Sequence, residues 1–418
     1  MLFSNRESFS KSFTTILALL PILNVYSFSF MSGISIGMLS ASILAMYGVF
    51  FALYFQRIDK NSSIILIVLF SWWLLGSIGV LFPSELGSSY TSYIYNSMKL
   101  MVWGVLIVFV GSRSFDGSRF VPLVINIALI CTLYIFLQAF FAYILGFSVS
   151  NGLDLWIISA NYDDYYYSQG LSSGQVRLAS IWFEPAQYAS YTLLALICLI
   201  FYPNVSKDDD NKVWKIILLS LGLVVSTSSA AIFWLMIVIT LSFVWKKNIG
   251  VLISLVFIPI LIFSILNFSI LLDYIKDQGV FGYSIYLALN KLSHWEESAR
   301  LGASFQTAFE ILNYGLHKYV GIGIGSESIL MSSLGLELQY LNSFSRVFIW
   351  SGILGVSVFI LIYFYSILIN YSNKLFVILF SYCFFSGFYS TMWTSPDSIL
   401  YLSLAIYSLR VRKESIEN

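Results

Sequence analysis

Long runs of apolar residues recur along almost the whole chain, and they constrain its fold more than any other feature. A helix needs about 20 apolar residues to cross the roughly 30 Å hydrocarbon core of a bilayer. Runs of suitable length occupy residues 13–31, 34–55, 62–82, 95–112, 120–147, 186–203, 250–268, 345–369, 375–391 and 398–410. Only 10% of the residues are charged, whereas soluble domains carry about 25%. We therefore expect an all-α polytopic membrane protein, with residues 1–418 forming a single integral membrane domain.

The run at 216–245 is too long for one ordinary span, because as a single helix it would extend about 45 Å. The polar break Ser226-Thr-Ser-Ser divides it into two short spans, which gives about twelve in all. With twelve spans and a cytoplasmic N-terminus, most of the 22 Lys and Arg residues face the cytoplasm, as the positive-inside rule requires. We therefore predict that both termini are cytoplasmic. The basic residues expected on the outer side are Lys99, Arg177, Lys276, Lys291, Arg300, Lys318 and Arg346.

Composition also argues against several classes of function. A net charge of +1 gives no reason to expect nucleic acid as a partner. The three cysteines lie inside apolar runs, which makes a disulfide framework or a thiolate metal site a poor explanation for them. The two histidines, His294 and His317, are too few to build a histidine metal centre. We expect neither a metal ion nor a cofactor.

Tryptophan occurs near the ends of several predicted spans, where interfacial anchors are common. The residues concerned are Trp103, Trp214, Trp245, Trp350 and Trp393. We expect them to lie at the level of the lipid headgroups.

The two long loops, 148–183 and 269–343, are both predicted to be outside, where they would form the active-site face. Near the end of the first loop stand Arg177 and Glu184, and charged residues that persist in so apolar a chain are candidates for function. Pro185 disfavours a helical backbone at Glu184, so the next span should begin at Pro185. Glu184 is then either half of a structural ion pair with Arg177, or an acid–base or substrate-orienting carboxylate beside a phosphate-binding arginine.

The second loop contains an amphipathic pattern from Ser298 to Leu312. Its predicted apolar stripe is Leu301, Phe305, Phe309 and Leu312, and another face carries Arg300, Ser304 and Thr307. Two arginines from separate outer segments, Arg177 and Arg300, suit a diphosphate because guanidinium groups bind phosphate oxygens bidentately. Contact with lipid headgroups is the alternative explanation for each arginine.

Two other stretches of these loops are distinctive. Gly321-Ile-Gly-Ile-Gly lacks the spacing of a nucleotide-binding loop, and we interpret it as a tight backbone turn near the membrane surface. The tyrosine-rich stretch at 161–170 includes Asp164 and Tyr165, which could bind a saccharide through aromatic faces and hydroxyl-bonding carboxylates. The alternative is an aromatic belt at the interface.

Four sequence features occur in a recognisable order. They are Arg177-x-x-Ser180-x-x-Phe183-Glu184-Pro185, the serine-rich break at 226–229, Arg300 ahead of the glycine turn, and Asn342 followed by Gly352-Ile-Leu-Gly355. Between about residues 170 and 360 the chain resembles the Wzy-type O-antigen polymerases, which are related to the O-antigen ligases and have a GT-C-like membrane fold.

This resemblance implies a metal-independent, inverting glycosyl transfer between undecaprenyl-diphosphate-linked oligosaccharides at the periplasmic face of a bacterial inner membrane. Membrane lipid and a chain-length regulator protein are the further partners that it implies. Arg177 and Arg300 would bind the diphosphate, Glu184 would orient or deprotonate the acceptor hydroxyl, and Arg346 would be a third cation. The residues expected to contact the substrate are Arg346, Tyr165, Asp164, Ser304 and Asn342.

One departure separates the polymerases from the ligases. The ligases commonly have a histidine, the proposed base, where this chain has Leu341, which favours a polymerase and leaves the base unidentified. A flippase for lipid-linked oligosaccharides also has about twelve spans, but a carrier is expected to bury charges near the bilayer midplane. A purely structural membrane protein would give no reason for the outer arginines.

Overall fold

The computed structural model describes residues 2–28, 35–55, 60–82, 90–111, 114–146, 158–160, 178–182, 184–202, 211–247, 276–279, 282–283, 285–287, 302–335 and 341–417. Most of these residues are helical. Four helical stretches are long and apolar enough to cross a membrane: Ser63–Leu81, Tyr90–Val110, Gly117–Ile144 and Ser343–Asn370. Several apolar helices are shorter, namely Ile36–Tyr47, Pro185–Phe201, Ser229–Ser242 and Lys374–Ser386. The expected fold class, a helical membrane protein, is confirmed at this level.

The chain divides into two compact units. Unit 1 comprises Met1–Leu20, Leu39–Arg119 and Trp295–Asn418, and unit 2 comprises Pro21–Met38 and Phe120–His294. Unit 1 is built mainly from α1 (Leu2–Leu23), α2 (Ile36–Phe55), α3 (Lys60–Leu81), α4 (Tyr90–Gly111), α13 (Ser304–Phe309), the 3-10 helix η4 (Glu310–Asn313), α14 (His317–Val320), α15 (Glu327–Ser333), α16 (Ser343–Asn370), α17 (Lys374–Ser386), the 3-10 turn η5 (Met392–Thr394) and α18 (Pro396–Glu417). Unit 2 holds most of α5 (Gly117–Ala139), the π-helical turn η1 (Phe140–Ile144), α7 (Pro185–Phe201), α8 (Lys212–Val225), α9 (Ser229–Lys247), and two short antiparallel strands, β1 (Tyr26–Phe28) and β2 (Ile158–Ala160), which pair Tyr26 with Ala160.

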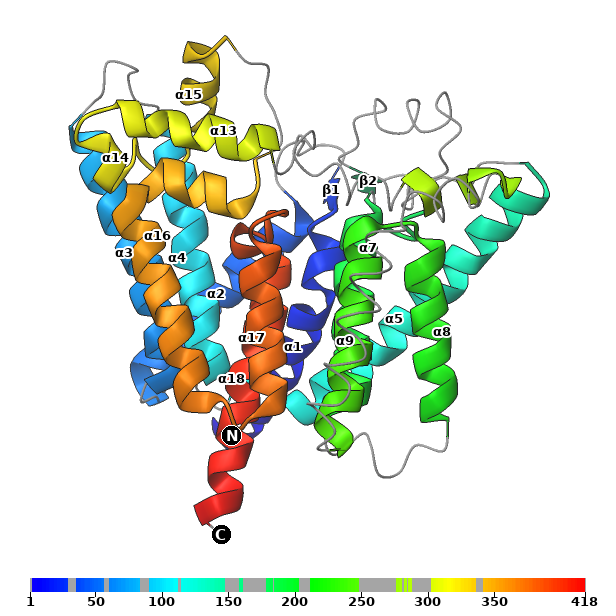
Figure 1. The fold of residues 1–418 in the computed structure, drawn as a ribbon. Coiled ribbons are helices and arrows are strands. Elements are labelled where there is room, and N and C mark those ends of the chain that lie inside the picture. Colours follow the sequence, from blue (N-terminus) through cyan, green and yellow to red (C-terminus); the bar gives the residue numbers. More distant parts are fainter. Residues whose placement is uncertain are drawn as a thin grey trace. The chain divides into compact units, whose positions relative to one another are not determined.

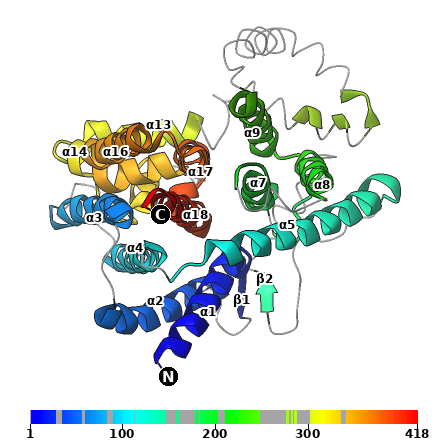
Figure 2. The same cartoon turned by 90° about the horizontal axis from the view of Figure 1, so that it is seen from below.

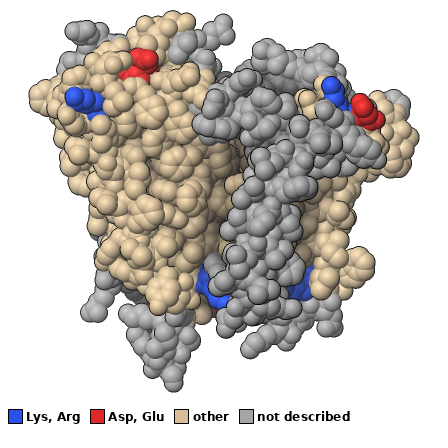
Figure 3. Space-filling view, viewed as in Figure 1, with Lys and Arg blue, Asp and Glu red and all other residues tan. Residues whose placement is uncertain are grey.

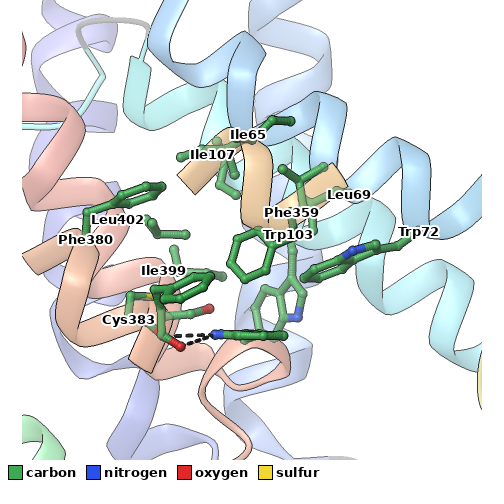
Figure 4. Close-up of a pocket in the computed structure, with 15 residues that line it drawn as sticks. Ile65, Leu69, Trp72, Trp103, Ile107, Phe359, Phe380, Cys383, Ile399 and Leu402 are labelled. Atoms are coloured by element: carbon green, nitrogen blue, oxygen red, sulfur yellow. Dashed lines mark hydrogen bonds between the residues drawn. The ribbon is translucent and has the colours of Figure 1, made fainter. Parts of the chain in front are cut away.

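The core of unit 1 forms where α3 packs on α16 and α4, and where α18 packs on α17 and α4. Figure 2 shows these helices close to end-on, with α18 between α4 and α17. Trp72, Trp103 and Phe359 contribute aromatic side chains to this core and line a cavity of only about 50 Å³ (Figure 4). The indole Nε1 of Trp393 donates hydrogen bonds of 3.0 Å to the carbonyl oxygens of Cys383 and Phe384, which lie in the last turn of α17.

Three of the five tryptophans expected at the interface are core residues, because Trp103, Trp350 and Trp393 are each no more than 5% exposed. Trp214 is 70% exposed, as an anchor would be, and the side chain of Trp245 is not described.

The helix α16 is interrupted at Gly352, whose backbone is not helical (φ 62°, ψ −162°). A Cβ atom at this position would lie 2.4 Å from the carbonyl carbon of Tyr319, so only glycine allows the segment at 319–320 to pass this close. The N–H of Ile322 donates to the carbonyl oxygen of Ile349 at 2.8 Å, which satisfies an acceptor near the break. Irregular backbone at membrane depth is tolerated where protein buries it. The predicted span at 345–369 is thus two helical segments, 343–351 and 353–370.

In unit 2, α7 packs against both α8 and α9. The serine-rich break predicted between α8 and α9 is confirmed as a turn over residues 226–228. Thr227 has a positive φ of 52°, and the Ser226 hydroxyl donates to the Leu223 carbonyl oxygen at 2.7 Å. The turn allows α9 to return alongside α8, as Figures 1 and 2 show.

The two ends of the chain lie at the same end of unit 1, and α13, α14 and α15 lie at the other (Figure 1). This arrangement separates the described part of the second long loop from both termini. Within the described residues, a helix stands at every predicted run, and the run at 250–268 lies outside them. The count of twelve spans and their orientation in the membrane remain predictions.

Candidate functional site

The N-terminal end of α16 is joined to α13 by a small buried hydrogen-bond network. The Ser304 hydroxyl accepts from the backbone N–H of Asn342 at 3.0 Å and donates to the Ser345 hydroxyl at 2.9 Å. Asn342 is the N-cap residue of α16, and its Oδ1 accepts from the Ser345 N–H at 2.8 Å. A side-chain acceptor at this position satisfies a donor that the helix itself leaves free. Ser304, Asn342 and Ser345 are all 0% exposed.

The helix α13 buries its hydroxyl-bearing face and exposes apolar side chains, which is the reverse of what an amphipathic helix does in water. Ser304 and Thr307 lie on its buried face, while Phe309 and Leu312 are 46% and 43% exposed. The rings of Phe305 and Phe309 pack against Phe344 of α16. A helix at the end of a membrane-embedded bundle has apolar surroundings available to it, so its hydroxyl face can turn inward to bond with backbone. Leu301 and Arg300 lie outside the described residues.

A cluster of charged side chains lies next to this network. Arg346, in the first turn of α16, places its Nε 3.0 Å from Oε1 of Glu327, the first residue of α15. The two side chains are 28% and 16% exposed. Lys99 of α4, which is partly buried, interacts electrostatically with both of them. The Arg346–Glu327 pair is thus a direct ion pair, and Lys99 lies within electrostatic range of both of its members.

The glycine segment, residues 321–325, brings α15 and its Glu327 next to Arg346. Gly321, Gly323 and Gly325 all have positive φ angles, of 82°, 125° and 80°. A Cβ on Gly321 would lie 2.2 Å from the Trp350 carbonyl oxygen of α16, and one on Gly325 would lie 2.5 Å from the Asn96 Nδ2 of α4. Asn96 is three residues ahead of Lys99, so one face of α4 contacts the glycine segment and carries the lysine. The predicted tight turn is thus a buried connection between α4 and α16.

His317 also stabilises the glycine segment. Its Nδ1 is 2.8 Å from the Gly321 carbonyl oxygen, and the residue is 8% exposed. The ring therefore supports the turn at the point where it begins.

Glu184 occupies the position predicted for it in unit 2. It is the N-cap residue of α7, with an extended backbone (φ −113°, ψ 137°), and Pro185 is the first helical residue. The Glu184 N–H donates to Oε1 of Gln187 at 3.4 Å, as part of a reciprocal capping arrangement in which each side chain faces the backbone N–H of the other residue. The carboxylate is partly buried. A capping role is thus present, and an acid–base role stays a prediction.

The other predicted site residues lie outside the described residues. They are Arg177, Arg300, Asp164 and Tyr165. The convergence of Arg177 with Arg300 is therefore still a prediction. Across the described ranges, no group of three or more His, Cys, Asp or Glu side chains could hold a metal ion.

Arg346 stands out in the sequence, but its ion-pair partner Glu327 and the neighbouring Lys99 do not stand out as parts of the same cluster. Lys99 had one available signal, because it is a charged residue inside the predicted span at 95–112. Glu327 had none, because it follows the glycine segment in an otherwise ordinary loop. Figure 3 shows the flank of unit 1 that faces the viewer, where the charged atoms of the described residues lie toward its ends and the surface between them is uncharged.

An apolar groove follows α3 and α4 on the outside of unit 1. It has a volume of about 570 Å³, and the side chains that line it include Phe70, Trp73, Met101 and Val108. Phe70 and Met101 are 58% and 70% exposed. Such a surface suits a hydrocarbon chain rather than water.

Comparisons with protein-family models, with characterised proteins and with solved structures find no match for this chain, so its function is argued from the residues of the site.

Proposed function

We propose that this protein polymerises undecaprenyl-diphosphate-linked oligosaccharide units at the periplasmic face of a bacterial inner membrane. One observation carries the proposal: two of the four sequence features on which the resemblance rests, the glycine turn and the Asn342–Gly355 segment, meet in unit 1. The glycine segment contacts the break at Gly352, and Asn342 begins the helix that carries Arg346. These features lie at the end of unit 1 away from both termini, next to the Arg346–Glu327 ion pair.

The proposed reaction requires cations beside the leaving group. In the proposed reaction, the bond between the anomeric carbon of the growing chain and its diphosphate oxygen breaks, and an acceptor hydroxyl oxygen forms the new glycosidic bond. Negative charge develops on the departing diphosphate, and preorganised cations stabilise it. Arg177 and Arg300 are assigned this role by resemblance, with Arg346 as the third cation.

The acceptor must also lose its hydroxyl proton. Glu184 is our candidate to orient that hydroxyl or to take its proton. Neither step calls for a metal ion or a cofactor. The groove along α3 and α4 supports a lipid-linked substrate, since an isoprenoid chain could lie against it while its diphosphate remains at the membrane surface.

A lipid-linked oligosaccharide flippase is the second candidate, and one observation favours it. Broken helices are frequent at the substrate sites of carriers, and α16 is broken at Gly352. The polymerase is preferred because the Arg346–Glu327 pair lies at one end of the bundle, whereas carriers place such groups near the midplane.

Substitution of the two outer arginines tests the proposal. Arg177→Ala and Arg300→Ala should each leave the protein inserted in the membrane and abolish long-chain polysaccharide, so that gels show only single repeat units. Arg→Lys variants should recover part of the activity, because charge remains but the bidentate geometry is lost. A normal long-chain ladder from both alanine variants would remove the assignment. Loss of all periplasmic repeat units, including single ones, would instead indicate the flippase.

A further inference from the structure

The stretch from residue 302 to residue 325 contains α13, η4, α14 and the glycine segment, and its side chains divide into three faces. We propose that this stretch lies in the headgroup region of the membrane, in the leaflet at the end of unit 1 away from both termini, and that its exposed apolar side chains insert among the acyl chains. The partner of this surface is therefore lipid. The inference goes beyond the proposed function, because it applies to a carrier as well as to a polymerase.

The exposed apolar side chains of the stretch follow a single stripe. They are spaced by three or four residues and are each between 43% and 50% exposed: Phe309, Leu312, Leu316 and Tyr319. The face that packs on unit 1 is different, because Ser304 and Thr307 are buried there beside Ala308 and Ile311. In water this arrangement would expose four large apolar side chains in a row, whereas lipid covers them at no cost.

A polar edge runs beside the apolar stripe. Gln306, Glu310 and Asn313 recur at the spacing of successive helical turns, and the first and the last of them are exposed. The Nδ2 of Asn313 donates to Oε2 of Glu310 at 2.9 Å. An apolar stripe that adjoins a polar edge is typical of a segment lying in the plane of the membrane surface, with one side toward acyl chains and the other toward water.

Contacts with α3 place the stretch at the depth of a spanning helix. Gly76 and Gly79 belong to Ser63–Leu81, which is long and apolar enough to cross a membrane. A Cβ on Gly79 would lie 2.5 Å from the carbonyl oxygen of Gly321 in the glycine segment. Beyond this level α3 continues with Leu81 and Phe82, which are 74% and 59% exposed. The glycine segment thus lies beside the last turns of α3, level with side chains that suit lipid.

The break in α16 gives the same depth. A Cβ on Gly352 would lie 2.4 Å from the carbonyl carbon of Tyr319, so α14 meets α16 at the break. At 1.5 Å per residue, the helical part from 353 to 370 is about 27 Å long, close to the roughly 30 Å of a hydrocarbon core. Ile353 and Leu354, the first residues after the break, are 37% and 46% exposed. The break and α14 therefore lie at the boundary between acyl chains and headgroups.

Two further features suit this boundary. Figure 1 shows α13 running across the ends of the long helices of unit 1 rather than along them, as an interfacial helix does. The Nζ of Lys318 lies 5.0 Å from the centre of the Tyr319 ring. A tyrosine ring is common at the level of the headgroups, and a lysine beside it can extend its ammonium group toward the phosphates.

Nitroxide labels on single added cysteines test the inference in phosphatidylcholine nanodiscs. Leu312→Cys and Leu316→Cys place a label on the apolar stripe, and Gln306→Cys and Asn313→Cys place one on the polar edge of the same stretch. Labels on the stripe should be more accessible to oxygen, which concentrates in lipid, than to a water-soluble nickel complex. Labels on the polar edge should show the opposite order, because that edge faces water.

All four positions are exposed, so the added cysteines remove no buried side chain, and an unchanged unfolding temperature checks the fold of each variant. The unmodified protein is the blank, since its own cysteines are buried. Labels at 312 and 316 that the nickel complex reaches more readily than oxygen would put the stripe in water and overturn the inference. Labels there that neither reagent reaches would mean that protein covers the stripe, which also overturns it. Because turnover is not measured, a failure of the proposed polymerase activity would leave this result unaffected.

Discussion

At the scale of single residues, the Ser304 hydroxyl is the clearest case of a polar group with a structural task. It accepts from the Asn342 N–H and donates to the Ser345 hydroxyl, all within a region closed to solvent. Ser304→Ala should therefore destabilise the protein by about 1–3 kcal/mol, because a buried N–H and a hydroxyl both lose their partner.

Thermal unfolding in detergent would measure this effect. Ser332→Ala is the matched control, since Ser332 is exposed and its hydroxyl donates to the Ser328 carbonyl oxygen of its own helix. An unchanged unfolding temperature for Ser304→Ala, equal to that of the control, would contradict the structural assignment.

Residue-level predictions from the sequence succeeded where the cause is local. Proline restricts the residue before it, so the start of α7 at Pro185 with Glu184 as cap could be predicted. The Lys99–Glu327–Arg346 cluster could not, because its members are more than 200 positions apart at the extremes and meet only when α4, α15 and α16 have packed. The positions of Arg177 and Arg300 stay predictions.

At the scale of elements, the glycine segment joins α3, α4 and α16 by backbone contact. Gly321→Ala should destabilise the protein by more than about 4 kcal/mol, because the new Cβ would meet the Trp350 carbonyl oxygen at 2.2 Å in addition to the cost of a positive φ.

Gly335→Ala measures the cost of the positive φ by itself. Gly335 also has a positive φ, of 64°, but nothing lies within 4 Å of its Cβ position, so alanine there should cost only about 1–2 kcal/mol. Unfolding temperatures of the two variants give the comparison. Equal losses would mean that backbone conformation alone, and not close packing, explains the glycines.

Periodicity predicted the elements better than their orientation. The break in the run at 216–245 was predictable, since four consecutive Ser and Thr residues interrupt an otherwise apolar sequence. Which face of α13 is buried could not be predicted, because an apolar stripe shows which side chains share a face but not whether protein or lipid covers it. The interruption of α16 at Gly352 was missed for a related reason: a single glycine in an apolar run is common in spans, and its partner at Tyr319 is outside the helix.

At the scale of the whole molecule, the orientation in the membrane can be tested directly. Cysteines introduced by Tyr165→Cys and Asn290→Cys should react with an impermeant thiol reagent added from outside, and Lys374→Cys should react only after the inner membrane is permeabilised. The native cysteines are buried and give little background. The reverse pattern of labelling would invert the topology on which the proposed function depends.

Unit 1 is assembled from the first and the last parts of the chain, and the whole of unit 2 except Pro21–Met38 is synthesised between them. The surface of α3 that receives the glycine segment is therefore made well before residues 319–352 leave the ribosome. Contacts of such long sequence separation form slowly, and α3 must remain in the bilayer with this surface covered by lipid or by an insertion chaperone. A nascent chain arrested before residue 319 should consequently be a far better substrate for membrane quality-control proteases than one released at full length.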